Sequence, residues 1–354
     1  RDLFKFYGHT GAVTSIFMNQ DQTLITGSED STLKTWTTPF ALYNQAFSYH
    51  RQGVNKVAFS PDQKFIASGG KDRRVVLTDI LNGEKVWEHR EHADPVLALN
   101  FRDSTVQSID EYSNYIIFHP GQSTAQSIPL GERSLSAAVF SPDGQQVLTG
   151  GFDSLAQLWD VNQQTLLLEL SLQSSIFSLA FAPDQSVFII GCEDGKAYLF
   201  DPSGNQLQVF EGHQGGVTAV NFTPSSKKII TGSEDQRVIL WNLSGQQLQQ
   251  FREYALPVQA VSVNAEETLL AVAYRQKSAI LIDLQEGYVI DDFRGHKDFV
   301  NDIIFPKQGN ILATACDDKF VRVWTKVKPP LFDFLKQGKL ENMDDRMKNQ
   351  FQIE

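Results

Sequence analysis

Histidine, a hydroxyl residue, aspartate and tryptophan recur in this sequence in a fixed order. A hydroxyl, an imidazole and a carboxylate are the groups from which a nucleophile, a base and an orienting partner are built, so each set could form a catalytic constellation. Three sets are complete, and six positions lead from Asp to Trp in each: His9, Thr26, Asp30 and Trp36; His213, Thr231, Asp235 and Trp241; His296, Thr314, Asp318 and Trp324. Because a repeat accounts for all of them, we assign these residues to the scaffold and expect no catalysis.

An apolar residue that follows a turn also recurs along the sequence at a regular interval. Successive positions in this series are 39 to 42 residues apart: Val13, Val54, Val96, Leu135, Ile176, Val217, Val258 and Val300. A period near 41 residues is typical of a four-stranded propeller blade. We therefore predict eight blades, with a seven-bladed ring as the alternative if the weak third or seventh repeat is used elsewhere.

Within a repeat the residues alternate as they do in β-strands. The sixth repeat illustrates the pattern, with an expected inner strand at 217–222, a second at 229–233 and a third at 238–241. Turns rich in Pro, Asp and Gly separate the strands, and a fourth, more amphipathic strand such as 206–210 follows the third. No helical period competes before residue 330, so we predict an all-β fold.

Over about 325 of the 354 residues, these features resemble the WD-repeat family. The resemblance implies a single β-propeller in which His, Ser or Thr, Asp and Trp form a buried hydrogen-bond relay across each blade. Such a relay is physically reasonable because buried polar groups need partners, and Trp supplies both apolar area and one N–H donor. Several repeats depart from the pattern, and the third and seventh are weakest, with Tyr112 and Gln276 near the Asp positions.

The N-terminal residues indicate how the ring closes. Leu3 and Phe6 stand six and three residues ahead of His9, as Leu207 and Phe210 do ahead of His213. We therefore expect residues 2–7 to complete the eighth blade, because closure removes exposed sheet edges. The expected domains are a propeller at 1–327 and a C-terminal tail at 328–354.

Apolar residues in the tail have roughly helical spacing: Leu331, Phe334, Leu335, Met343 and Met347. We expect one or two short helices in a tail that packs on the propeller or is frayed, with a partner-binding helix or a linker as the alternative.

Composition limits the classes of function. The formal charge of −11 argues against a general phosphate-binding surface, so nucleic acid is an unfavoured partner. Only two cysteines occur, without a CxxC or Cys/His cluster, and we predict neither a metal site nor a cofactor. No apolar run is long enough for a membrane helix, and we expect a monomeric cytoplasmic protein. Arg1 in place of Met suggests a chain excised from a longer one.

The resemblance also implies a binding surface on one face of the ring. Its residues lie just before the relay Asp or beside the inner-strand anchor: Glu29, Lys71, Leu97, Phe152, Phe177, Glu193, Glu234, Arg275, Phe299 and Asp317. We hypothesise that Phe152 and Phe177, on adjacent blades, form an apolar anchor site while the acids attract a Lys- or Arg-bearing segment. The alternative is that the acids only solubilise the surface and the rings tuck into loops.

The predicted function is therefore that of a non-catalytic scaffold or recognition module that binds a protein or peptide on the ring face. One alternative is the sensor region of a larger multidomain signalling protein. Another is a propeller that binds phosphopeptides or nucleic acid, which would need an Arg and Lys cluster on the face. Only Lys71, Arg73, Arg74 and Arg275 come near such a cluster.

Overall fold

The computed structural model describes residues 13–18, 23–28, 33–37 and 42–325, except 121–124, 254 and 308–310. The regular elements of these residues are all β-strands. The chain divides into two units, one of residues 42–325 and one of residues 1–41 and 326–354. In the described ranges, no helix is long and apolar enough to cross a membrane. The predicted helical tail and the tail domain at 328–354 lie outside the described residues.

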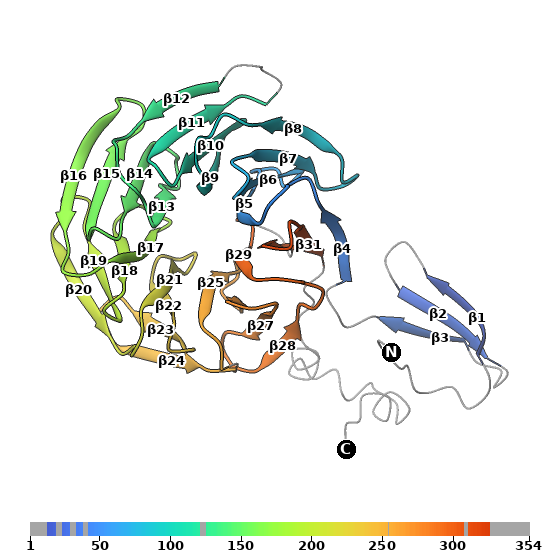
Figure 1. The fold of residues 1–354 in the computed structure, drawn as a ribbon. Helices are drawn as coiled ribbons and strands as arrows, with labels where there is room; N and C mark the ends of the chain where they lie inside the picture. The colour runs from blue at the N-terminus through green and yellow to red at the C-terminus, as the bar shows by residue number, and fades with distance from the viewer. Residues whose placement is uncertain are drawn as a thin grey trace. The chain divides into compact units, whose positions relative to one another are not determined.

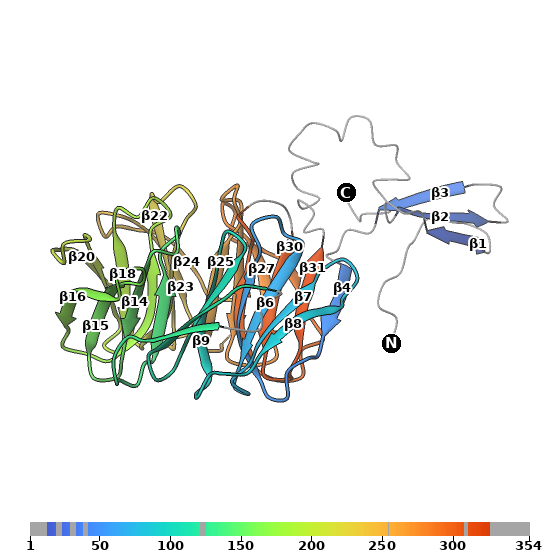
Figure 2. The ribbon, with the colours of Figure 1, turned by 90° about the horizontal axis from the view of Figure 1, so that it is seen from above.

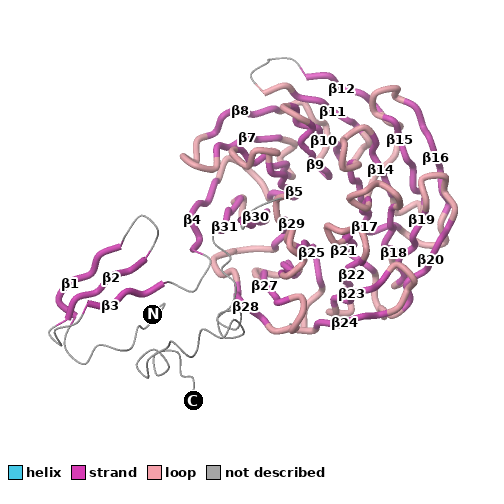
Figure 3. The backbone as a smooth tube through the Cα atoms, turned by 180° about the vertical axis from the view of Figure 1, so that it is seen from behind, coloured by secondary structure: helices cyan, strands magenta, loops and turns pink. Residues whose placement is uncertain are grey.

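Residues 42–325 form a closed ring of seven four-stranded antiparallel blades, seen face-on in Figure 1 and from behind in Figure 3. The second to eighth repeats supply blades 1 to 7. In Figure 2, which shows the ring from its side, the strands run between its two faces.

The strands of blades 1 to 3, from inner to outer, are β5 (Val54–Phe59), β6 (Phe65–Gly70), β7 (Val75–Asp79) and β8 (Lys85–His89); β9 (Val96–Arg102), β10 (Thr105–Asp110), β11 (Asn114–Phe118) and β12 (Ala125–Pro129); β13 (Ala137–Phe140), β14 (Gln146–Gly150), β15 (Leu155–Asp160) and β16 (Thr165–Ser171). Those of blades 4 to 6 are β17 (Ile176–Phe181), β18 (Phe188–Cys192), β19 (Lys196–Phe200) and β20 (Gln206–Glu211); β21 (Val217–Phe222), β22 (Lys228–Ser233), β23 (Val238–Asn242) and β24 (Gln247–Phe251); β25 (Val258–Val263), β26 (Leu269–Tyr274), β27 (Ala279–Asp283) and β28 (Val289–Asp292).

Blade 7 combines strands from both ends of the ring. Its inner strands are β29 (Val300–Ile304), β30 (Ile311–Cys316) and β31 (Val321–Thr325), and its outer strand is β4 (Leu42–Phe47). Phe47 lies opposite Val321 in the register and is buried with it in one core cluster. On the inner side β29 contacts β5 of blade 1, so the ring is continuous.

The preferred prediction of eight blades is wrong, and the alternative of seven agrees with the ring. The repeat outside the ring is the first, although its signature is complete, and not the weak third or seventh. The closing strand was also assigned to the wrong segment: β4, not residues 2–7, pairs with β31. Phe47 precedes His50 by three residues, as Phe6 precedes His9, so the two segments carry the same signal. In the ring, each outer strand leads directly into the next blade, and β4 leads into β5 in this way.

The first repeat forms a three-stranded antiparallel sheet of β1 (Val13–Met18), β2 (Thr23–Ser28) and β3 (Leu33–Thr37). Its register shifts between Val13 and Ser15, and a similar shift follows the first residue of β5 in blade 1. Its backbone is therefore that of a blade without a fourth strand, because β4 belongs to blade 7.

We predict that removing residues 1–41 leaves the thermal unfolding midpoint of the ring nearly unchanged, because β4 remains. Removing residues 1–47 also deletes the strand that covers β31 and the buried Phe47. Loss of a large buried aromatic alone costs about 3–5 kcal/mol, so this shorter protein should unfold at a clearly lower temperature. Circular dichroism melts of the two truncated proteins check this, and equal destabilisation by both would contradict the assignment of β4.

Candidate functional site

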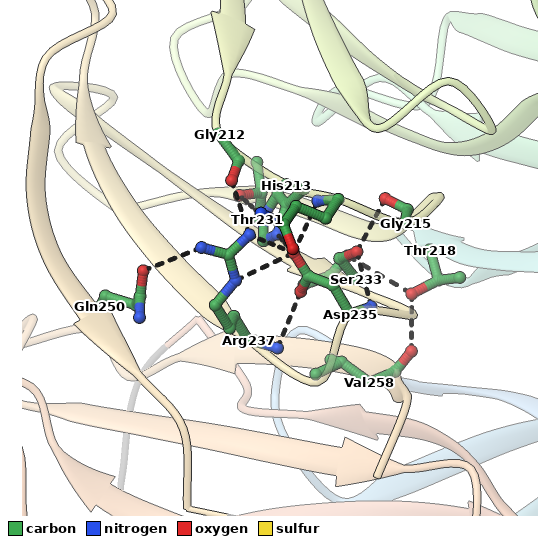
Figure 4. A network of polar contacts seen from close by, with 12 residues as sticks. Gly212, His213, Gly215, Thr218, Thr231, Ser233, Asp235, Arg237, Gln250 and Val258 are labelled. Atoms are coloured by element: carbon green, nitrogen blue, oxygen red, sulfur yellow. Dashed lines mark hydrogen bonds and ion pairs between the residues drawn. The ribbon is translucent and has the colours of Figure 1, made fainter. Parts of the chain in front are cut away.

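In blade 5, the relay connects His213 with Thr231 and Asp235 by hydrogen bonds (Figure 4). His213 donates from Nδ1 to the Asp235 carboxylate at 3.0 Å, and its Nε2 lies 2.7 Å from Thr231 Oγ1. Trp241 Nε1 donates to the same hydroxyl at 2.8 Å. Arg237 also binds Asp235, at 2.6 Å. The four residues identified from the sequence therefore share one network, in which the hydroxyl and carboxylate are engaged within the scaffold.

The relay of blade 7 is arranged differently. His296 Nε2 lies 2.9 Å from Thr314 Oγ1, and Trp324 Nε1 donates to that hydroxyl at 3.1 Å. The other ring nitrogen of His296 faces the Phe293 carbonyl and not Asp318. Asp318 is held instead by Arg322, at 2.6 Å. For the first repeat, the side chains of His9, Thr26, Asp30 and Trp36 lie outside the described residues, as does Glu29.

Blade 2 contains a relay that the sequence interpretation missed. His92 faces Asp110 at 3.1 Å and Ser108 at 2.6 Å, and all three residues are buried. In the complete repeats, the relay Asp stands four residues after the Thr, and this offset leads from Ser108 to Tyr112. Asp110 stands only two residues after Ser108, so the offset does not find it. In blade 1, a Cβ at the corresponding Gly70 would lie 2.5 Å from His50 Nδ1. A side chain at the position of Gly70 would therefore point at the relay histidine. In blade 2 this position is held by Asp110, which takes the place of the usual relay Asp.

Polar residues just after the inner-strand anchor fasten blades 1, 3, 5 and 7 to the blade that follows each of them. Asn55 donates to the carbonyl of Val96 at 3.0 Å, and Thr218 to that of Val258 at 2.6 Å. Ser136 and Asn301 make the same contact with the following blade. We call these contacts the interblade clasps, and the one from Asn301 to Val54 crosses the closure between blades 7 and 1.

Phe177 occupies the clasp position in blade 4 but makes no clasp. The next residue, Ser178, donates to the Val217 carbonyl at 2.9 Å in its place. The Phe177 ring lies over Gly216, where a Cβ would come within 2.6 Å of it. It also meets Phe152 edge-on, with 6.2 Å between ring centroids, and Phe152 is 65% exposed. The fold thus presents an aromatic pair that takes no part in the interblade clasps.

The central channel opens beside this pair into a cavity of about 420 Å³. Three of the residues predicted from the sequence line it: Lys71, Leu97 and Phe177. The other six described members of the predicted set do not line it: Phe152, Glu193, Glu234, Arg275, Phe299 and Asp317. The structure therefore brings only part of the set together at the channel.

Ion pairs neutralise much of the charge that the sequence places on this face. Lys71 pairs with Asp317 at 2.7 Å across the closure, and Arg275 lies 3.5 Å from Glu234. Glu193 is exposed beside Gly216. Glu111, which the sequence interpretation missed, lines the cavity, and burial together with the nearby Asp94 raises the pKa of its carboxyl. Among the described residues, no Lys or Arg forms an ion pair with Glu193 or Glu111.

Neither a metal centre nor a disulfide is formed by the part of the chain that the structure describes. It contains no group of three or more His, Cys, Asp or Glu residues placed to hold a metal ion. Cys192 and Cys316 are free and buried, and burial raises the pKa of their thiols, to about 12 and about 11. A thiol with a raised pKa is a poor nucleophile at neutral pH.

The ring, its relays and its repeat length define a WD-repeat β-propeller. Comparison with protein families agrees: the IFT122 first beta-propeller family matches residues 12–283, and the WD domain, G-beta repeat, matches residues 287–325. The chain therefore belongs to the IFT122 first beta-propeller family, and its last blade carries a further WD repeat.

Several curated proteins are similar over part of this chain. The small ribosomal subunit protein RACK1y of Oryza sativa is 33% identical over 84 residues, which are 23% of this chain and 25% of that protein. The mitotic checkpoint protein bub3 of Dictyostelium discoideum is 28% identical over 131 residues, 36% and 39% of the two chains. The guanine nucleotide-binding protein subunit beta of Arabidopsis thaliana is 27% identical over 167 residues, 43% and 44%. The match thus spans less than half the length of each of these proteins.

We predict that Asp110→Ala lowers the free energy of unfolding by about 3 kcal/mol, because it leaves buried His92 and Ser108 without their acid. Burial raises the pKa of Asp110, but hydrogen bonds from His92 and two backbone N–H groups bring it below its ordinary value. Asp94→Ala is the matched control, with an expected change below about 0.5 kcal/mol. Urea unfolding at pH 7 measures both, and equal effects would refute a relay in blade 2.

His296 should make the ring sensitive to acid. Burial, assisted by Arg322, lowers the pKa of His296 to about 4, whereas an unfolded histidine titrates near 6.5. The unfolded chain therefore binds a proton first, and stability is lost as pH falls from about 6.5 to 4. We predict that the stability advantage of the natural protein over His296→Gln shrinks by about 2 kcal/mol between pH 7 and pH 5. A pH-independent difference in urea unfolding would contradict this.

Proposed function

We propose that the ring is a non-catalytic recognition module that binds a protein or peptide at the channel mouth, with Phe152 and Phe177 as the anchor. The observation that carries the proposal is the clasp at blade 4. Ser178 takes over the contact with Val217, so a large aromatic ring stands where blades 1, 3, 5 and 7 use a polar side chain for assembly. Aromatic anchors surrounded by polar residues are typical of the energetic centres of interfaces.

The charge around the anchor supports a partner with a basic segment. Glu193 is exposed beside the aromatic pair, and burial together with the nearby Asp94 raises the pKa of Glu111 against the opposing charge of Lys71. A Lys or Arg from a partner would favour the charged form of both acids. A phosphopeptide or nucleic acid is less well supported, since Lys71 and Arg275 are already paired with Asp317 and Glu234.

The relatives support the same class of function. They include a guanine nucleotide-binding protein subunit and a target of rapamycin complex subunit, and a subunit is by definition a component of an assembly. We extend only the general role of protein binding to this chain, and we propose that the ring acts as a monomer in the cytoplasm.

We predict that Phe152→Ala together with Phe177→Ala weakens binding of the purified natural partner at least about 30-fold, as expected for loss of a hot spot of 2 kcal/mol or more. The partner is first isolated by affinity pull-down with mass spectrometry, and its affinity is then measured by calorimetry. Val86→Ala is the control, because Val86 is an exposed apolar residue on outer strand β8. Unchanged affinity in the double variant, with both variants folded, would disprove the anchor.

The charge is tested with the same partner. Glu193→Lys should slow association and reduce its dependence on salt, since an exposed charge at the rim acts mainly on the encounter rate. A faster association would instead indicate an acidic partner.

A further inference from the structure

The outer strands of blades 3, 4 and 5 carry an exposed leucine at equivalent positions. These strands, β16, β20 and β24, lie on the outer circumference of the ring (Figure 1). In each of them one residue is skipped in the register with the third strand: Leu167, Leu207 and Leu248. A skipped residue marks a β-bulge, whose extra residue is left unpaired. These leucines are 48%, 52% and 45% exposed.

Strand β16 is more apolar than the other two. Its sequence is TLLLELS, whereas β20 and β24 surround their leucine with glutamines. Leu166, beside the bulge, is a further 42% exposed. Leu168 packs against the next blade, where a Cβ at Gly204 would lie 2.7 Å from its Cδ1. Leu168 is therefore covered by blade 4, whereas Leu166 and Leu167 remain exposed.

The outer edge of β16 is paired with no strand of the described chain. Other outer strands show features that protect a free edge. In β8, Glu88 is bound by Lys85, Arg74 and Arg90, and β12 ends in Pro129. Strand β28 is short and ends in two aspartates. At seven residues, β16 equals the longest strands of the ring, and it has neither Pro nor Lys.

The charge of β16 indicates the chemistry of an occupant. Glu169 is its one charged residue and is exposed. It accepts a hydrogen bond from Gln157 at 2.8 Å, and among the described residues no Lys or Arg forms an ion pair with it. A second copy of this acidic chain would bring another Glu169 to the same edge, whereas a basic segment would compensate the charge.

We propose that the outer edge of β16 binds an extended segment of a partner polypeptide as a fifth strand of blade 3. The unpaired N–H and C=O groups of the edge require an extended backbone, because only a strand can pair with them in register. The segment carries aliphatic side chains for Leu166 and Leu167 and a Lys or Arg for Glu169. This surface is separate from the channel mouth, so it stands or falls independently of the proposed ring-face function.

The test uses the folded chain and a short synthetic peptide in which valine alternates with lysine. Hydrogen exchange with and without the peptide locates the protected amides, and calorimetry measures affinity. The matched probe is the same peptide with N-methyl groups on alternate backbone amides, which keeps the side chains and removes strand pairing. Leu167→Lys is the edge variant, and Leu248→Lys, at the equivalent bulge of β24, is its control.

We expect protection of β16 amides and affinities at least about tenfold weaker for the N-methyl peptide and for Leu167→Lys. Glu169→Gln should weaken binding, and Leu248→Lys should leave it unchanged. No binding up to the solubility limit, protection confined to other strands, or equal affinity of the N-methyl peptide would overturn the proposal. Self-association of the chain that Leu167→Lys abolishes would also overturn it, because the occupant would then be a second copy.

Discussion

The pairing of β4 with β31 is the contact on which the rest of the ring depends. Each blade buries its faces against its two neighbours, so no blade is complete until the last meets the first. The closure has two parts: β4 covers β31 on the outside, and the clasp from Asn301 to Val54 joins blades 7 and 1 near the channel. Radial repetition also leaves only short, protected sheet edges along the channel. The first strand of the ring, β4, and its last strand, β31, therefore belong to the same sheet.

The polar contacts determine which residues hold the ring together and which remain available to bind a partner. The relays satisfy buried donors inside the blades, and the interblade clasps do the same between them. Once these contacts are made, only the residues that they do not use are available for a partner. Phe177 is available because Ser178 replaces it in the clasp, and Phe152 extends the aromatic surface outward. At the circumference, β16 is distinguished in a similar way by leucines that no other strand of the described residues covers.

Much of the fold follows from the sequence because blades repeat with a nearly constant period. The relay of blade 5 could be assigned from offsets alone, and so could the face that carries Phe152 and Phe177. The closing strand could not, because Phe6 and Phe47 stand at the same distance from a histidine and only the partner of β31 distinguishes them. Asp110 could not be assigned from offsets either, because it stands two residues before the expected position and still reaches the relay histidine of its blade, His92. The pairing of Lys71 with Asp317 depends on closure, and spacing along the chain says nothing about it.

Disulfide trapping tests the closure most directly. Gln45 and Val323 lie opposite each other in the pairing of β4 with β31, at a separation suited to a disulfide. Phe4 stands five residues ahead of His9, as Gln45 does ahead of His50, so Phe4→Cys with Val323→Cys tests the competing segment. The account predicts that under mild oxidation the Gln45→Cys, Val323→Cys protein forms the disulfide, seen by mass spectrometry, and the Phe4→Cys, Val323→Cys protein does not. The reverse result would contradict the seven-bladed ring.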